Sequence, residues 1–184
     1  MAKLEIARLG NPVLRQTAQP VDLKELSEPD SDVQVLIDDM IETMRSDGGV
    51  GLAAPQVSRS VQVVILECEE NERYPEAQVI PLTVLVNPEI THYSEETAMG
   101  WESCLSLIDF RGLVRRSREV TMEAFNRQGE KTVIQAKEFL AVVLQHEIDH
   151  LHGKVFLDRM EDLTKLAYIK EFETYWLKQE PTVS

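Results

Sequence analysis

The chain has 184 residues, a length that predicts one domain with a sizeable core. Its 19 basic and 32 acidic side chains give a net charge of −13 at pH 7, which disfavours nucleic-acid or anionic-membrane binding as its main activity. No apolar run reaches the length of a signal-peptide core or a membrane span. We therefore expect a cytoplasmic protein that does not bind membranes and that keeps both cysteines, Cys68 and Cys104, as thiols.

Residues 1–30 are predicted to form an irregular N-terminal arm, because turn signals such as Gly10–Asn11–Pro12 interrupt its few apolar residues. A helix should follow between Ser31 and Gly48, since apolar residues recur there at helical spacing and a glycine then ends the pattern. Ser31 and Gln34 have the spacing of a capping box at the start of this helix. The apolar residues of the helix are Val33, Leu36, Ile37, Met40, Ile41 and Met44.

Short strands are predicted for the middle of the chain, where β-branched residues gather between turn signals. A polar loop through Asn71 and Pro75 separates the first strand from the next, and Gln128–Gly129 marks the turn of a hairpin. The predicted strands are Val61–Cys68, Leu82–Val86, Ile90–Tyr93 and the two arms of the hairpin, Val120–Phe125 and Val133–Ile134.

Two more helices are predicted in the last part of the chain. The first begins near Phe139, ends near Gly153 and is the most apolar helix in the sequence. The second, from Asp162 to Lys178, places charges between apolar residues and is expected to pack on a sheet as an amphipathic closing helix. Because strands and helices do not alternate regularly, the predicted fold class is α+β, with an N-terminal and a C-terminal helix.

The most apolar helix carries a pattern typical of a metal site. His146 and His150 are four residues apart, so they lie one above the other on one helical face, near enough to bind one ion. Glu147 projects beside them and can reach a metal-bound water without being a ligand, which is the arrangement of metal-assisted hydrolysis. The alternative is a helix with satisfied polar residues, but the apolar flanks predict burial, and buried polar groups need partners.

A catalytic divalent metal usually keeps three protein ligands and one open position, so a third ligand is required. The protease class with the motif His-Glu-x-x-His-x-x-Gly-x-x-His is excluded, because Phe156 stands where its third histidine would be. A second class of zinc protease takes a downstream glutamate, and Glu171 and Glu173 lie at about the required separation. The third candidate is Cys104, upstream, whose thiolate would be a strong, soft ligand.

The remaining charged residue of this helix is Asp149. A carboxylate in so apolar an element needs a cationic partner or exposure to solvent. We expect Arg116, which follows the cysteine in the sequence, to pair with Asp149 and to tie its own segment to the helix.

The segment Gly49–Gln56 follows the first predicted helix and reads Gly-Val-Gly-Leu-Ala-Ala-Pro-Gln. Its small residues allow another backbone to approach closely, and its glycines allow turns that other residues cannot form. It is not a phosphate-binding loop, because it lacks a terminal Gly-Lys-Ser/Thr and follows a helix instead of a strand. Gln56 is the residue in it that can act chemically.

Three segments together resemble the motifs of the peptide deformylase family, in the right order and at suitable separations: Gly49–Gln56, Glu102–Ser106 and His146–His150. The resemblance runs from the first predicted helix to the end of the metal helix. It implies antiparallel strands packed around a central metal-binding helix, in a single catalytic domain spanning 1–184. The chain departs from the family at Ser103, where a glycine is expected, and the serine would either strain a positive φ angle or narrow the substrate groove.

The reaction implied by this resemblance is hydrolysis of the N-formyl group from the N-terminal formyl-methionine of newly synthesised polypeptides, with release of formate. The implied cofactor is Fe²⁺, for which Zn²⁺, Ni²⁺ or Co²⁺ can substitute, although ligand spacing alone would suggest Zn²⁺. The implied partners are N-formylmethionyl nascent peptides, met at the ribosome. Two alternatives remain, a zinc metallopeptidase with a downstream glutamate ligand and an inactive deformylase-like binding protein; the intact Glu147 and Gln56 argue against the second.

The resemblance also implies a role for each site residue. The metal ligands are Cys104, His146 and His150, and Glu147 is the general base. The oxyanion is held by Gln56 and the backbone N–H of Leu105. The peptide is expected to lie as an added strand, and the expected substrate-binding residues are Gly49, Val50, Gly51 and Ser103 along its backbone and Arg111, Val142 and Val143 around its methionine.

Overall fold

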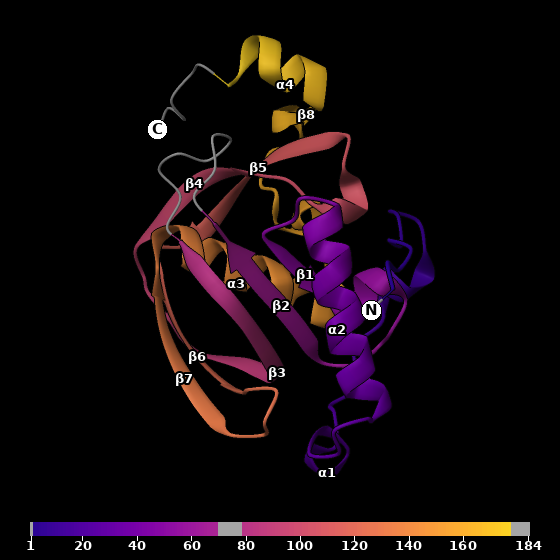
Figure 1. The fold of residues 1–184 in the computed structure, drawn as a ribbon. Coiled ribbons are helices and arrows are strands. Elements are labelled where there is room, and N and C mark those ends of the chain that lie inside the picture. The colour runs from indigo at the N-terminus through magenta and orange to yellow at the C-terminus, as the bar shows by residue number, and fades with distance from the viewer. Residues whose placement is uncertain (1, 70–78, 178–184) are drawn as a thin grey trace.

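The computed structural model describes residues 2–69 and 79–177, and within these the strands form two antiparallel sheets with helices packed against them (Figure 1). This confirms the predicted α+β class and the antiparallel pairing of the strands. The polar loop predicted through Asn71 and Pro75 lies outside the described residues, as does Lys178, the predicted end of the last helix. Among the described residues, no helix combines the length and the apolar character needed to cross a membrane.

The N-terminal arm is irregular, as predicted, apart from a 3-10 turn at Pro12–Arg15 and the single-turn helix α1 (Leu23–Leu26). Helix α2 (Asp32–Ser46) follows, and the Ser31 hydroxyl caps it by accepting the backbone N–H of Gln34 at 3.3 Å. The second half of the predicted capping box is wrong. The Gln34 side chain turns away from Ser31, because its amide donates to the carbonyl oxygens of Leu26 and Arg127, at 2.7 and 2.9 Å.

The larger sheet, called the large sheet below, has five strands in the order β1-β2-β3-β6-β7. The two short strands predicted around Asn87 are one long strand, so that boundary was wrong. The pairing of this strand with β6 shifts register near Asn87, whose φ is 50° and whose side chain bonds the backbone N–H and C=O of Val21 at 2.8 and 2.9 Å. The strands are β1 (Gly51–Ala53), β2 (Val63–Cys68), β3 (Ile80–Tyr93), β6 (Glu119–Phe125) and β7 (Lys131–Lys137).

The smaller sheet, called the small sheet below, has three strands in the order β4-β5-β8, which the sequence did not predict. They are β4 (Thr97–Glu102), β5 (Phe110–Ser117) and β8 (Leu166–Tyr168). The last helix, α4 (Ile169–Tyr175), is shorter than the predicted Asp162–Lys178. The start of that prediction is wrong, because Leu163–Lys165 form a 3-10 turn and β8 pairs with β5.

Helix α3 (Glu138–Leu151) is the central helix of the prediction, and it packs on one face of the large sheet while α2 packs on the other (Figure 1). Successive residues of a strand point to opposite faces. Val64 and Leu66 of β2 accordingly join the core under α3, whereas Val63 and Ile65 join the core under α2. The apolar face that α3 buries consists of Ala141, Leu144, Ile148 and Leu151.

Candidate metal centre

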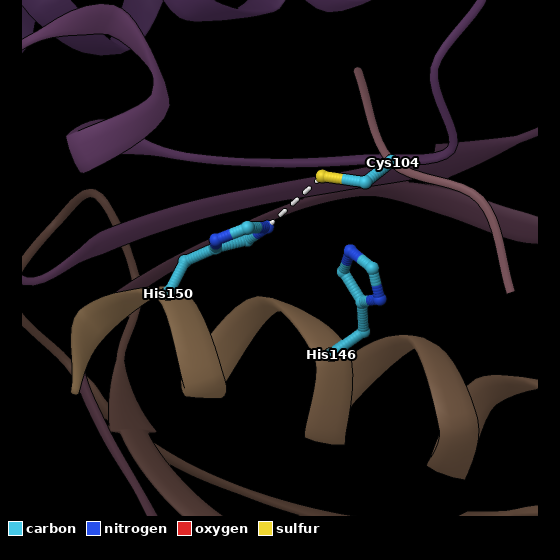
Figure 2. A group of neighbouring side chains, drawn as sticks. All are labelled: Cys104, His146 and His150. Atoms are coloured by element: carbon cyan, nitrogen blue, oxygen red, sulfur yellow. Dashed lines mark hydrogen bonds between the residues drawn. The ribbon is translucent and has the colours of Figure 1, made fainter. Parts of the chain in front are cut away.

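Three buried side chains from two distant parts of the sequence meet at one point. Cys104 lies directly after β4, and His146 and His150 lie on successive turns of α3, with all three side chains pointing toward one another (Figure 2). One potential ligand atom from each lies within 4.8 Å of the other two, and Cys104 Sγ is 3.4 Å from His150 Nε2. One sulfur and two imidazole nitrogens suit a divalent transition metal and leave a position open.

The rival third ligands, Glu171 and Glu173, are exposed on α4 and do not belong to this group. The only such group of potential metal ligands among the described residues is the Cys104, His146 and His150 triplet. The interpretation of a downstream glutamate ligand is therefore wrong.

Glu102 supports the site, a role that the sequence did not predict. Its carboxylate lies 2.7 Å from His146 Nδ1, which fixes the ring and leaves the other nitrogen facing Cys104. Metal-binding histidines are commonly held in this way by a carboxylate on the nitrogen that does not bind the ion. Burial raises the pKa of Glu102, but hydrogen bonds from His146 and Arg116 outweigh burial and lower that pKa to about 2. The carboxylate is thus charged at any working pH.

Arg116 joins this carboxylate to the metal helix. Its guanidinium donates to Glu102 at 2.8 and 3.1 Å and to Asp149 at 2.6 Å, and the side chains of all three residues are buried. Arg159 donates to Asp149 from the other side at 3.0 Å. The predicted pair between Arg116 and Asp149 is confirmed. Removing one partner from a buried ion pair commonly costs about 3–5 kcal/mol, because the other charge stays buried and unpaired.

The charges around Cys104 favour its metal-binding form. Burial raises the pKa of this thiol, but His150 and His146 outweigh burial and hold the pKa well below its ordinary value. His146 is shifted in the opposite direction. Burial lowers its pKa, but Cys104 and Glu102 outweigh burial and raise this pKa well above its usual range. The neighbouring histidines therefore favour the thiolate of Cys104, which is the form of cysteine that binds metals.

Glu147 lies on α3 directly after the first histidine of the group. It is buried, and within the described part of the chain its Oε2 has no hydrogen-bond partner, an exception among buried polar atoms that marks a place for a ligand. Burial raises the pKa of Glu147, and the charges of His146 and His150 offset only part of that rise. A glycine at position 51 is required here, because a Cβ on Gly51 would lie 2.3 Å from Glu147 Oε1.

Gln56 is held with its amide N–H₂ toward the cysteine. Its Oε1 accepts the backbone N–H of Ala53 at 2.8 Å, which leaves Nε2 at 3.4 Å from both Cys104 Sγ and Ser106 Oγ. Leu105 begins the 3-10 turn that follows the cysteine, and its carbonyl oxygen accepts a hydrogen bond from Arg8 at 2.6 Å. Gln56 and Leu105 therefore both lie next to Cys104.

A cavity of about 370 Å³ opens beside the metal group. It lies between β1, an edge strand of the large sheet, and β4, an edge strand of the small sheet. The sequence did not predict four of its apolar lining residues, Trp101, Ile108, Phe139 and Ile169, because nothing in their local pattern separates them from core residues. All the predicted substrate-binding residues line it: Gly49, Val50, Gly51, Ser103, Arg111, Val142 and Val143.

Ser103 is free of the strain that its place in the motif suggested. It is not among the residues with positive φ, so the backbone here suits any amino acid. Its side chain is exposed at the wall of the cavity. The structure therefore excludes the predicted backbone strain at Ser103. The other predicted effect, a narrower substrate groove, stays a prediction.

Comparison with known proteins decides the family, because the family model for polypeptide deformylase matches residues 3–166. The chain belongs to this family. Peptide deformylase 1 of Bordetella pertussis is 44% identical over 163 residues, which cover 89% of this chain and 90% of that protein. Peptide deformylase 2 of Pseudomonas putida is also 44% identical, over 164 residues that cover 89% of this chain and 91% of the relative.

Solved deformylase structures share the fold. A Met-Ala-Ser-bound class I type b peptide deformylase from Acinetobacter baumannii has a TM-score of 0.81 and 40% identity, with 86% of this chain and 99% of that chain covered. The peptide deformylase of Thermotoga maritima has a TM-score of 0.77 and 32% identity, with 88% and 100% covered.

The deformylase family is metal-dependent, and the Cys104, His146 and His150 group gives this chain a place for the ion. The chain is a hydrolase that removes the N-formyl group from nascent peptides. Neither a metallopeptidase nor an inactive binding protein is supported by these relatives.

Proposed function

We propose that Cys104, His146 and His150 hold Fe²⁺, with Zn²⁺, Ni²⁺ or Co²⁺ able to replace it, and that Glu147 is the general base of deformylation. One observation carries the proposal. Three buried ligand atoms converge beside a buried carboxylate oxygen that has no partner within the described residues, next to a cavity of about 370 Å³. Such an ion, when bound, acidifies a coordinated water and polarises a carbonyl oxygen.

In the proposed reaction, Glu147 accepts a proton from the attacking water at its carboxylate. It then delivers this proton to the amine nitrogen as the carbon–nitrogen bond of the formamide breaks. The water oxygen stays on the formyl carbon, so the products are formate and a free amino group. The raised pKa of Glu147 supports this role, because it brings the carboxylate nearer to the range in which a group both takes and gives a proton.

The negative oxygen that forms during attack is held by Gln56 Nε2 and the backbone N–H of Leu105. Gln56 is suited to this task because the bond from Ala53 to its Oε1 fixes the amide before substrate arrives. A donor fixed in advance costs no reorganisation when charge develops.

We propose that the substrate lies as an extended strand between β1 and the residues that follow β4. Both β1 and β4 are edge strands, so each has backbone groups that a peptide can pair with. Val50 and Ser103 both line this gap, as do Gly49 and Gly51, whose missing side chains let Leu105 and Glu147 approach closely. The methionine side chain then points to Val142 and Val143 of α3 and the stem of Arg111.

The proposed setting is the cytoplasm, where the chain acts as a single catalytic domain on formylated peptides as they leave the ribosome. New polypeptides carry the formyl group at their N-terminus, so the substrate is most abundant there.

Formate release from formyl-Met-Ala-Ser, compared with cleavage of unformylated Met-Ala-Ser, tests the proposed site. The variant Glu147→Gln should keep the metal and the fold but lose about 100- to 10,000-fold in kcat, because an amide cannot carry the proton. Glu171→Gln is the matched control and should keep the parent's rate, since Glu171 is exposed on α4. Turnover of Glu147→Gln within a few-fold of the parent would exclude Glu147 as the base.

A further inference from the structure

The N-terminal arm bonds both segments that carry the proposed oxyanion donors. Ala7 donates its backbone N–H to the carbonyl oxygen of Gln56 at 2.7 Å, and Leu9 donates its backbone N–H to the carbonyl oxygen of Ser106 at 3.0 Å. Two residues of chain span at most about 7 Å. The stretch Ala7–Leu9, called the strap below, therefore limits the distance between Gln56 and the turn that contains Ser106.

Arg8, in the middle of the strap, bonds the same turn through its side chain. Its guanidinium donates to the carbonyl oxygen of Leu105 at 2.6 Å. Within the turn, the backbone N–H of Leu107 donates to the carbonyl oxygen of Cys104 at 3.0 Å. The C=O and N–H of one trans peptide unit point to opposite sides, so this bond directs the Leu105 N–H away from the turn. Bonds to the carbonyl groups of Cys104 and Leu105 therefore fix the direction of the Leu105 N–H.

The strap is anchored to the rest of the fold on both sides. Before it, the backbone N–H of Leu4 donates to Oγ1 of Thr43, a buried side chain of α2, at 2.8 Å. After it, the backbone N–H of Ala18 donates to the carbonyl oxygen of Leu151, at the end of α3, at 2.8 Å. Ala7 itself is buried. These contacts hold the strap in place while it bonds the two donor segments.

The separation of the two donors matters because both must bond the oxyanion at once. A donor is effective when it lies about 2.7–3.1 Å from the position that the oxyanion will occupy. A misplacement of about 1 Å in an active site can cost on the order of 100-fold in rate. Gln56 Nε2 and the Leu105 N–H lie on separate segments, and the strap bonds the backbone of both.

We propose that the strap is a positioning element for the oxyanion pair and that Arg8 is its positioning side chain. The strap holds the Leu105 N–H at a fixed separation from Gln56 Nε2 before substrate arrives. This inference rests on the proposed roles of Gln56 and Leu105 in deformylation. It gives the N-terminal arm an effect on the chemical step and not on substrate binding.

The variant Arg8→Met tests the strap, because it keeps a side chain of similar reach and removes the donors. It should lower kcat for formyl-Met-Ala-Ser on the order of tenfold, less than the loss of about 100- to 1,000-fold for a missing donor, because the Leu105 N–H is still present. KM should stay within about twofold, since the oxyanion forms only in the transition state. Arg8→Lys should recover part of kcat, because its ammonium can also donate to a carbonyl oxygen.

Arg15→Met is the matched control. Arg15 lies on the same arm and forms an ion pair with Asp158, so the bond that it loses joins the arm to the 3-10 turn Phe156–Arg159 and not to either oxyanion donor. Arg15→Met should keep the parent's kcat. Arg8→Met and Arg15→Met should have similar Tm, because each loses one exposed side-chain contact. Equal falls in kcat would overturn the inference, since general loosening of the arm would then explain both.

Combining Arg8→Met with Gln56→Ala gives a second, independent measurement. Gln56→Ala alone should lower kcat on the order of 100-fold. With a single donor left there is no separation to hold, so adding Arg8→Met should then lower kcat only about twofold further. A further loss of about tenfold, as in the parent, would overturn the inference, because Arg8 would then act independently of the oxyanion pair.

A parent-like kcat in Arg8→Met, with Gln56→Ala impaired, would overturn the role of the strap and leave the proposed site intact. A rise in KM alone would overturn it too, since the arm would then act on binding. A parent-like kcat in Gln56→Ala would instead overturn the proposed oxyanion pair, and the role of the strap with it. The two failures are therefore distinguishable.

Discussion

Cys68 and Cys104 are both buried and form no disulfide, and they differ in what surrounds them. Cys68 lies in the apolar core under α3, where burial alone raises its pKa. Cys104 faces two histidines and the amide of Gln56, and its pKa is lowered. The chemistry of a cysteine therefore depends on its neighbours more than on its burial.

Replacing each cysteine by alanine tests this difference. Cys104→Ala should lose most of the bound metal, because two histidines alone make a weak site, whereas Cys68→Ala should keep about one ion per chain as the parent does. The measurement is metal content per chain after purification. Equal metal in Cys104→Ala and the parent would remove the ligand assignment.

Ser103 allows a prediction about binding. Because its φ is not positive, replacing it by glycine relieves no strain, and the change acts on the groove alone. Ser103→Gly should lower KM for formyl-Met peptides with a smaller change in kcat, since backbone pairing is shared by the bound substrate and the transition state. Ser103→Ala should lie between the two, because it removes the hydroxyl and keeps Cβ. A KM that is unchanged or higher in Ser103→Gly would mean that the serine does not narrow the groove.

At the residue scale, the sequence was sufficient to predict those site residues whose relative positions are set by a single helix. His146 and His150 had to share a face, and a charged Asp149 in an apolar helix required a partner such as Arg116. Glu102 was missed because its role depends on strand pairing. Only when β4 lies beside β5 does this carboxylate lie between Arg116 and His146.

At the element scale, the small sheet was missed because its strands lack the usual pattern. Strand β4 contains Ala98 and Gly100, which are poor strand formers, and β5 contains Gly112 and the arginines that pair with buried or exposed acids. The last helix was predicted too long because the segment before it does have apolar residues at helical spacing. Backbone pairing of β8 with β5 overrides the helical preference of Leu166–Tyr168.

Helix α3 begins with a residue in a strained conformation. Glu138 has a φ of 49°, a region in which residues other than glycine lose about 1 kcal/mol or more. The backbone N–H of Glu138 donates to the carbonyl of Arg118 at 2.8 Å, and its carboxylate accepts from the Arg118 side chain at 2.6 Å. These two bonds to Arg118 therefore stabilise the strained conformation of Glu138 at the turn from β7 into α3.

We predict that Glu138→Gly is more stable than Glu138→Ala by about 1 kcal/mol, because both lose the ion pair and only glycine relieves the strain. In a chain of this size the difference corresponds to about 2–4 °C in Tm, measured by thermal unfolding with the metal bound. Glu42, exposed within α2, is the matched control, and there alanine should be more stable than glycine. The same order at both positions would contradict the strain at Glu138.

At the scale of the whole molecule, the metal group stands where separate parts of the fold meet. Cys104 belongs to the connection between two strands of the small sheet, and the histidines belong to the helix packed on the large sheet. The N-terminal arm also reaches this junction. Ala7 N–H donates to the Gln56 carbonyl at 2.7 Å, and Leu9 N–H donates to the Ser106 carbonyl at 3.0 Å. An arm to which the sequence assigned no chemistry thus joins two of the three motifs.

A bound ion should therefore stabilise the fold as a whole. A ligand that binds only the folded chain adds about 4 kcal/mol at a thousand times its Kd. For a domain of this size, that energy corresponds to about 8–16 °C in Tm. We predict that the chelated protein unfolds at a temperature lower by this amount than the protein saturated with Ni²⁺, measured by calorimetry at fixed protein concentration.

Cys104→Ala is the decisive control for this prediction. With one ligand removed, most of the rise in Tm on adding Ni²⁺ should disappear. Cys68→Ala should keep the full rise, measured from its own, lower Tm without metal. The surface is strongly acidic, with a net charge of −13, and ions bound there would act on the parent and on both variants alike. Equal rises in all three proteins would place the stabilising ion at the surface, and no rise in the parent would show that these parts of the fold hold together without the metal.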